Sequence, residues 1–185
     1  MIKIGETLVS PEKITKIISL LNQVNHLSGD VAEVGVYKGG TAKILCQYSD
    51  SNIHLFDTFE GMPYFREEFD KDWKLGSFGE VNFDEILSLF SNQKNVKIHK
   101  GIFPKDTSKS VENEVFKFVH LDVDNYDSYK ESLNFFYNKV VSNGIIVFDD
   151  YNCDCCPGAN IAIDEFFLDK PEKIIIDEAV YIIKI

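Results

Sequence analysis

The sequence predicts an α/β fold: a doubly wound, mostly parallel sheet of seven strands that ends in an antiparallel hairpin. Two observations support this prediction. Short apolar runs alternate along the chain with stretches that have the apolar spacing of amphipathic helices. The last two apolar runs, by contrast, are separated only by Asp177 and Glu178, which leaves no room for a helix between them.

The first predicted element is a helix over residues 11–27. Ser10 is a suitable N-cap, and Pro11 suits the first helical position because the N–H that proline lacks has no helical partner there. Apolar residues then recur with a helical period on one face, at Ile14, Ile17, Ile18 and Leu21.

Strands and helices alternate after this helix. Strands are predicted over residues 31–36, 52–57, 96–99, 116–122 and 145–149. Helices are predicted over residues 41–48, 82–91, 126–141 and 159–168. Right-handed crossovers between parallel strands place such helices on both faces of the sheet. The runs at 173–176 and 179–185 are the two strands of the final hairpin.

The composition predicts one domain over residues 1–185, with an N-terminal helical segment at 1–28. A chain of 185 residues, 44% of them hydrophobic, is large enough for one sizeable core. The net charge of −11 argues against nucleic acids and anionic membranes as partners, since both attract basic patches. No apolar stretch approaches the ~20 residues of a membrane span, and the first residues lack the apolar core of a signal peptide. We therefore expect a cytoplasmic protein.

Residues 64–80 form one long stretch without a helical or strand pattern. The stretch contains the only tryptophan, Trp73, together with several other aromatic residues. Irregular segments of this length within compact domains are usually lids or binding loops, and the aromatic content favours an ordered role. We expect a lid-like loop, with a surface excursion as the alternative.

Two pairs of carboxylates follow two of the apolar runs. Asp122 and Asp124 come at the end of the run that begins at Phe116, and Asp149 and Asp150 end the next strand. The carboxyl ends of parallel strands meet at the edge where open α/β sheets bind ligands. Carboxylates gathered there repel one another unless a cation neutralises them, which indicates a hard, oxygen-liganded metal ion. The alternative is that these side chains cap helices or are solvated at the strand ends.

A glycine-containing turn follows the first predicted strand. Gly35, Gly39 and Gly40 let the backbone turn sharply and approach a ligand before a helix N-terminus, although their spacing is not G-x-G-x-x-G and a structural turn is the alternative. Glu33 suits a ligand that carries positive charge, such as an amino-acid portion. Asp57 ends the second strand, where it can accept hydrogen bonds from ribose hydroxyls or serve as a turn residue.

Three of the four cysteines, Cys153, Cys155 and Cys156, are clustered. Their spacing matches neither the usual paired zinc pattern nor C-x-x-C, so ordinary reduced thiols in a loop are expected rather than a zinc site. His120 lies on the same side of its strand as Asp122. We expect a hydrogen-bonded core histidine rather than a catalytic one.

Several segments resemble the macrocin O-methyltransferase family. They lie at residues 29–41, 56–63, 101–107, 121–128, 148–151, 156–159 and 162–167, and together they span about residues 28–168. The two segments that contain the aspartates are the most specific. The resemblance implies a Rossmann-like class I methyltransferase fold, S-adenosylmethionine as methyl donor, Mg²⁺, and methylation of sugar hydroxyls.

The resemblance also implies roles for individual residues. Asp122, Asp149 and Asp150 match the metal ligands, and Asp124 matches the general base. The implied cofactor contacts are Glu33, Gly35, Tyr37, Gly39, Thr41, Asp57, Thr58, Ser77, Phe78 and Asp122. Two positions beside the site depart from the family pattern: Asn125 stands in place of an apolar residue, and Asp127 in place of glutamate.

The expected function is an S-adenosylmethionine- and Mg²⁺-dependent O-methyltransferase whose small-molecule acceptor is a sugar or a glycoside. A catechol-type metal-dependent O-methyltransferase shares the same carboxylate chemistry, because vicinal phenolic oxygens also chelate a metal. A nicotinamide-dependent oxidoreductase is disfavoured by the lack of G-x-G-x-x-G and by the hairpin. A non-catalytic Rossmann-like binding protein is the remaining alternative. The oligomeric state is left open, and a homodimer is compatible with the sequence.

Overall fold

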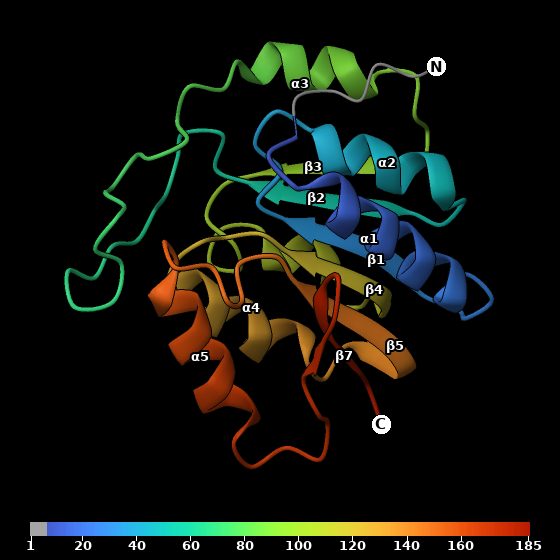
Figure 1. Ribbon diagram of the computed structural model, residues 1–185. Coiled ribbons are helices and arrows are strands. Elements are labelled where there is room, and N and C mark those ends of the chain that lie inside the picture. The colour runs from blue at the N-terminus through green and yellow to red at the C-terminus, as the bar shows by residue number, and fades with distance from the viewer. Residues whose placement is uncertain (1–6) are drawn as a thin grey trace.

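The computed structural model describes residues 7–185, whose strands form one seven-stranded sheet (Figure 1). The strands are β1 (Asp30–Val34), β2 (Ile53–Asp57), β3 (Val96–Lys100), β4 (Phe116–Leu121), β5 (Val140–Phe148), β6 (Ile175–Ile176) and β7 (Val180–Ile183). Their order across the sheet is β3-β2-β1-β4-β5-β7-β6. Strands β1 to β5 pair in parallel, and β7 runs antiparallel to both β5 and β6. The predicted fold class and its final hairpin are therefore confirmed.

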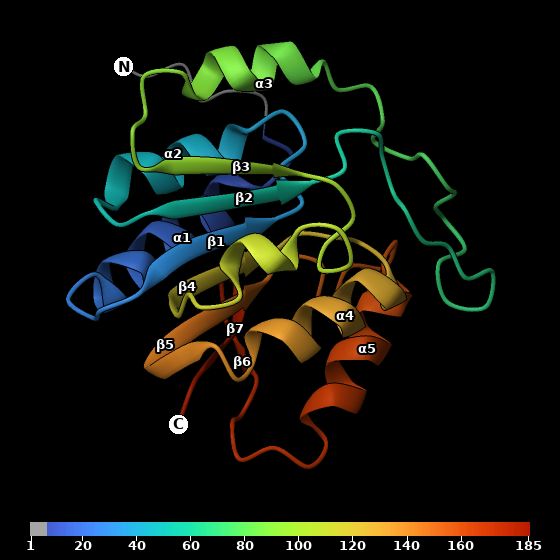
Figure 2. The same ribbon diagram turned by 180° about the vertical axis from the view of Figure 1, so that it is seen from behind.

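Helices cover both faces of the sheet (Figures 1 and 2). They are α1 (Pro11–Val24), α2 (Gly40–Tyr48), α3 (Phe83–Phe90), α4 (Tyr126–Phe136) and α5 (Pro157–Phe167), with a short 3-10 helix η1 (Ser108–Val111). One apolar core joins α1, α2 and α3 to one face, and a second joins α4 and α5 to the other. Alternate residues of β1 serve the two cores, since Val31 packs in the first and Ala32 in the second.

The predicted helix over residues 126–141 is wrong at its C-terminal end. Helix α4 ends at Phe136, and the chain enters β5 at Val140, which pairs with Phe116 of β4. The backbone N–H of Phe116 donates to the carbonyl of Lys139 at 2.8 Å, so this stretch extends the parallel ladder. β-branched Val140 and Val141 suit a strand, and the pairing with β4 overrides the helical spacing of the sequence.

The direction in which the chain winds reverses between β1 and β4, the two central strands. In an open parallel sheet, the crevice outside the carboxyl ends of the strands at such a point is where ligands bind. The ladder continues past the strand ends there: the N–H of Asp122 donates to the carbonyl of Val34 at 3.0 Å, and that of Asp149 to Leu121 at 2.8 Å. The aspartates at the ends of β4 and β5 are thus held at this edge by backbone hydrogen bonds.

The irregular segment at 64–80 is anchored rather than free. Its ends are joined by backbone hydrogen bonds, from Met62 N to the carbonyl of Ser77 and from Gly76 N to that of Met62. Asp70, only 1% exposed, accepts hydrogen bonds from the N–H groups of Arg66 and Tyr126, which ties the loop to the first turn of α4. The absence of helix and strand predicted for this segment is confirmed.

The two departures from the family pattern have structural roles near this loop. Asn125 is the N-cap of α4, and its Oδ1 accepts a hydrogen bond from Ser128 N at 3.0 Å. Asp127 makes a bidentate pair with the Arg66 guanidinium, with both N···O distances at 2.7 Å. The pair is a second attachment between the loop and α4.

Among residues 7–185, no helix has both the length and the apolar character that crossing a membrane requires.

A chain of polar side chains crosses the strands on the α4 side of the sheet. Asp30 Oδ2 lies 2.9 Å from His54 Nε2, His54 Nδ1 lies 3.0 Å from His99 Nε2, and His99 Nδ1 lies 3.0 Å from Ser110 Oγ. Burial lowers the pKa of His99 to about 4, and the neighbouring His54 and Lys97 add to this effect. His99 is therefore neutral at pH 7 in the folded protein.

We predict that His99, in this row of hydrogen-bonded side chains, makes the folded protein less stable in acid. Between pH 6.5 and about 4 the unfolded chain protonates His99 and the folded protein does not, so the free energy of unfolding falls as the pH is lowered through this window. The fall should be smaller in His99→Asn, measured by urea unfolding at several pH values. The control, His26→Asn, alters an exposed histidine and should follow the wild type. Equal pH dependence in wild type and His99→Asn would contradict the prediction.

Candidate active site

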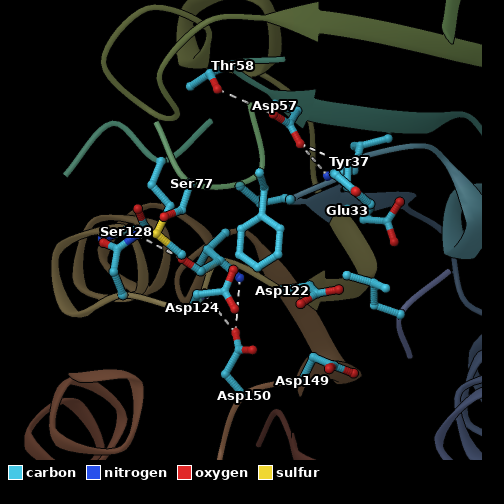
Figure 3. A pocket seen from close by; sticks show the side chains of 18 of the residues that line it. Glu33, Tyr37, Asp57, Thr58, Ser77, Asp122, Asp124, Ser128, Asp149 and Asp150 are labelled. Carbon is cyan, nitrogen blue, oxygen red and sulfur yellow. Dashed lines mark hydrogen bonds between the residues drawn. The ribbon is translucent and has the colours of Figure 1, made fainter. Parts of the chain in front are cut away.

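A cavity of about 370 Å³ opens at the carboxyl edge of the sheet, where four carboxylates line one end (Figure 3). Asp122 and Asp124 follow β4, and Asp149 and Asp150 follow β5. Figure 3 shows these four side chains together at one end, with Asp57 and Thr58 at the other. The structure thus brings together the residues that the sequence predicts as metal ligands and general base.

Asp150 organises the turn that carries Asp124. Its buried Oδ2 accepts hydrogen bonds from the N–H groups of Val123 at 3.1 Å and Asp124 at 2.9 Å, and lies 2.8 Å from the Tyr129 hydroxyl. Asp124 has φ +61°, a left-handed conformation that is uncommon in residues other than glycine. Only Oδ1 of Asp150 remains to face the cavity.

The carboxylates shift one another's pKa values because they lie close together in a partly buried cluster. Burial raises the pKa of Asp122 well above its usual range, and the negative charges of Asp149 and Asp150 raise it further. Burial and the charge of Asp150 do the same to the pKa of Asp124. The raised pKa values of Asp122 and Asp124 indicate that the negative charge of the cluster is not fully neutralised by the surrounding side chains.

Two cationic side chains act on Asp149. Lys13 reaches across from α1, and its Nζ donates to the Asp149 backbone carbonyl at 2.5 Å and to Oδ2 at 3.1 Å. His120 Nε2 lies 3.7 Å from Oδ1. Burial raises the pKa of Asp149, but the contacts with His120 and Lys13 outweigh it, so the pKa falls below its usual value. Asp149 is therefore ionised.

His120 is a fully buried core histidine, as expected. Its Nδ1 lies 3.1 Å from Glu33 Oε1. Burial lowers the pKa of His120, but the adjacent carboxylates of Asp149 and Glu33 raise it to about 10. An imidazolium between two carboxylates orients both of them while itself lying out of reach of the cavity.

Glu33 lies at the end of β1 and lines the wall of the cavity near the carboxylate cluster. The side chain is 1% exposed, and among the described residues its Oε2 has no hydrogen-bond partner. Burial raises its pKa, although His120 acts in the opposite direction. A buried acceptor left open toward a cavity suits a positively charged donor on a ligand.

Gly35 is required by the sheet itself. Its φ is +89°, and a Cβ at this position would lie 1.7 Å from the carbonyl oxygen of Asp122. The glycine therefore allows β1 to approach β4, a reason that the sequence does not reveal. Gly39, with φ +78°, is the N-cap of α2 and faces Leu89 and Phe90 of the α3 helix and not the cavity.

Asp57 holds the turn after β1 against the end of β2. Its Oδ2 accepts hydrogen bonds from the N–H groups of Val36 and Tyr37, each at 2.8 Å, and its Oδ1 accepts one from Phe59 N at 2.7 Å. The carboxylate thus has the turn role that was the alternative interpretation, and it also lines the cavity. Thr58 lines the cavity too, and its hydroxyl donates to the carbonyl of Gly61 at 2.7 Å.

The end of the irregular loop closes one side of the cavity. The Phe78 ring packs edge-on against the Tyr37 ring, with centroids 5.8 Å apart, and contacts Trp73 at 4.9 Å. The Tyr37 hydroxyl donates to Glu80 Oε1 at 2.6 Å. Thr41 and Ser77 also line the cavity, so every predicted cofactor residue except Gly39 does so.

Sequence reasoning missed several residues of this cavity. Lys13 carries no local signal, because its contact with Asp149 joins the first helix to the fifth strand. Ser128, at the start of α4, and Met62 and Trp73, near or in the irregular loop, also line it. So do Cys153, Cys155 and Cys156, which the sequence indicated only as loop thiols.

The donor set fits a hard divalent cation. Carboxylate oxygens of Asp122 and Asp149 lie within 4.8 Å of each other, and so do carboxylate oxygens of Asp124 and Asp150. Asp149 Oδ1 is buried and has no hydrogen-bond partner among the described residues. Oxygen donors that are crowded, buried and incompletely satisfied match what Mg²⁺ binds in proteins. A cation of this kind would also balance the repulsion that raises the pKa values of Asp122 and Asp124.

Comparison with known proteins gives consistent results. Demethyldecarbamoylnovobiocin O-methyltransferase of Streptomyces niveus is 26% identical over 180 residues, covering 88% of this chain and 68% of the relative. 8-demethyl-8-(2,3-dimethoxy-alpha-L-rhamnosyl)-tetracenomycin-C 4'-O-methyltransferase of Streptomyces olivaceus is 26% identical over 147 residues, covering 71% of this chain and 56% of the relative.

The solved structure of the O-methyltransferase NovP has the same fold. It matches with a TM-score of 0.80 at 24% identity, over 96% of this chain and 81% of NovP. The model of the Macrocin-O-methyltransferase (TylF) family matches residues 2–177, nearly the whole sequence. The chain therefore belongs to the Macrocin-O-methyltransferase (TylF) family and is an S-adenosylmethionine-dependent O-methyltransferase.

Proposed function

We propose that this enzyme depends on Mg²⁺ and methylates a hydroxyl of a sugar or glycosylated small molecule. The proposal rests on one observation, the convergence of four carboxylates on one end of the cavity. The names of the two Streptomyces relatives, one of which specifies a rhamnosyl group, support a glycoside as the acceptor class. We further propose that residues 1–185 work as one domain.

The chemistry requires a group that accepts a proton, because a sugar hydroxyl is a poor nucleophile at neutral pH. Mg²⁺ bound by Asp122, Asp149 and Asp150 Oδ1 would lower the pKa of an acceptor hydroxyl, and S-adenosylmethionine would supply the methyl group. Asp124 would take the proton of that hydroxyl while the methyl group passes from the sulfur of the donor, which leaves as the neutral thioether, to the acceptor oxygen. Asp150 supports this step by fixing the backbone of Asp124 through two N–H bonds to its other oxygen.

The residues at the other side of the cavity suit the methyl donor. Glu33 Oε2, which has no hydrogen-bond partner among the described residues, could accept a hydrogen bond from the positively charged amino group of the methyl donor. Asp57, Thr58 and Thr41 offer oxygen acceptors for the hydroxyls of the nucleoside portion. The Tyr37–Phe78 pair gives an aromatic wall at the end of the lid-like loop, and this wall would keep water from the methyl group.

The loop at 64–80 acts in this proposal as a lid of restricted movement. Asp70 and the Arg66–Asp127 pair fix its middle to α4, so only its outer part is free to adjust to an acceptor. The acceptor class is testable by methyl transfer to a panel of nucleotide sugars and glycosides beside catechols. Transfer to catechols alone would favour the catechol-type alternative.

We predict that Asp124→Asn lowers kcat by about 10²–10⁴-fold, the usual contribution of a positioned base. The amide cannot take the proton, while the size of the side chain is preserved. Calorimetry should show that S-adenosylmethionine binding is unchanged, which separates a catalytic effect from misfolding. Full turnover by Asp124→Asn would show that another group is the base.

Removal of the metal should abolish methyl transfer. EDTA is expected to stop the reaction and added Mg²⁺ to restore it, because the acidic cluster then regains its neutralising cation. Asp122→Asn should raise the Mg²⁺ concentration needed for half-maximal rate by at least about tenfold, as loss of a ligand exceeds the loss of an outer-shell partner. Asp169→Asn, an exposed carboxylate on the surface, is the matched control. Undiminished activity in EDTA would refute the metal requirement.

Glu33→Gln should weaken the binding of S-adenosylmethionine by about 10–150-fold. A hydrogen bond to a charged group contributes about 1.5–3 kcal/mol, and 1.4 kcal/mol corresponds to tenfold in affinity. Isothermal titration calorimetry measures this directly, with Glu112→Gln as the exposed control. Circular dichroism of each variant checks that the buried substitution leaves the fold intact, and an unchanged dissociation constant in a folded Glu33→Gln would remove Glu33 from the binding site.

A further inference from the structure

Three thiols converge on the cavity from the turn between β5 and α5. One sulfur from each of Cys153, Cys155 and Cys156 lies within 4.8 Å of the others, and all three residues line the cavity. The Sγ atoms of Cys155 and Cys156 are 3.6 Å apart. All four cysteines of the chain are free, so no disulfide occupies these sulfurs.

The turn is held in this shape by its own backbone. Cys153 N donates to the carbonyl of Asp150 at 3.1 Å, and Cys156 N donates to that of Cys153 at 3.0 Å. Asn160 Oδ1 accepts a hydrogen bond from Asn152 N at 2.8 Å, which fixes the start of the turn against α5. The thiols are therefore gathered before any ligand arrives, which lowers the cost of binding one.

A fourth donor comes from a different strand. Asp124 Oδ1 lies 3.6 Å from Cys156 Sγ, and Asp150 Oδ1 lies 3.9 Å from it. The local sequence spacing matches no usual zinc pattern because it contains only three of the four donors. The fold supplies the fourth by bringing the turn after β4 beside the turn after β5 (Figure 1).

The spacing of these atoms suits a tetrahedral metal ion. Zinc binds thiolate sulfur at about 2.3 Å and carboxylate oxygen at about 2.0 Å, so a regular tetrahedron has S···S edges of about 3.8 Å and S···O edges of about 3.5 Å. The Cys155–Cys156 and Cys156–Asp124 distances, both 3.6 Å, are close to these edges. Soft sulfur donors select Zn²⁺ over Mg²⁺, which prefers the oxygen cluster nearby.

We propose that Cys153, Cys155 and Cys156, with the Asp124 carboxylate as fourth ligand, form a Zn²⁺ site beside the carboxylate cluster. Zn²⁺ bound there engages the oxygen that the proposed function uses to take a proton, so zinc occupancy inhibits methyl transfer. This second part rests on the proposed function, whereas the binding site itself does not. The site gives the enzyme a response to zinc through the side chain of its base.

Binding is tested first, without any substrate. The full chain, reduced and freed of metal, is titrated with Co²⁺ in excess Mg²⁺, so that the oxygen cluster is occupied. The wild type should show thiolate-to-cobalt charge-transfer absorption that saturates at one ion per chain and disappears when Zn²⁺ is added. Absence of this absorption, with no zinc retained in competition against a chromophoric chelator, would overturn the site.

Single substitutions identify the ligands. Cys153→Ser and Cys155→Ser should each lower the zinc affinity by more than about 100-fold, since even outer-shell partners of a ligand contribute about 10–100-fold. Cys46→Ser is the matched control, because this fourth thiol lies on α2 and does not line the cavity. If both turn variants bind zinc as tightly as the wild type and Cys46→Ser, the ion lies elsewhere and the proposal is wrong.

Activity is tested last, at a fixed and saturating Mg²⁺ concentration. Zinc should inhibit the wild type and Cys46→Ser at the concentrations that fill the site, and a zinc-selective chelator should restore the rate. Cys155→Ser should need about 100-fold more zinc for the same inhibition. Equal inhibition of Cys155→Ser would overturn the inhibitory role. Failure of every acceptor to be methylated would count against the proposed function and leave the zinc affinities standing.

Discussion

The repulsion among four carboxylates at the carboxyl edge of the sheet is the constraint on which the rest of the site depends. Parallel β4 and β5 end side by side, and each delivers two aspartates into the same partly buried volume. Burial and mutual repulsion raise the pKa values of Asp122 and Asp124, so the ionised cluster favours positive charge beside it. Lys13 of α1 and His120 of β4 supply part of that positive charge at Asp149.

The four aspartates are not equivalent in their surroundings. Among the four, Asp150 has the most hydrogen bonds within the protein: its Oδ2 accepts from the backbone N–H groups of Val123 and Asp124 and from the Tyr129 hydroxyl. Asp149 lies beside the cationic side chains of Lys13 and His120. Asp124, whose own backbone is left-handed, lies at the cavity beside the thiol of Cys156. One aspartate therefore builds the turn that carries another. This division follows from the hydrogen bonds and not from residue type.

Residues near the site often serve both the fold and the cavity. Position 35 must be glycine because a side chain there would collide with the backbone carbonyl of Asp122. Asp57 accepts hydrogen bonds from three backbone N–H groups. Asn125, an unexpected residue in its motif, caps α4. A motif residue can thus be required for the structure of the sheet edge, whether or not it also binds a ligand. The sequence motif does not distinguish the structural role from the binding role. The cofactor and metal roles of these residues remain predictions.

The sequence predicts the order of the elements, the final hairpin and the position of the four aspartates, because apolar periodicity and strand-end position are local properties of the chain. It misjudged residues 137–141, where pairing with β4 overrides helical spacing. The contacts between distant segments are visible only in the folded protein: Lys13 with Asp149, Asp70 with α4, and Asp124 with Cys156. The physical reason is that hydrogen bonds, charge pairs and metal geometry depend on distances in space, which local sequence patterns do not encode.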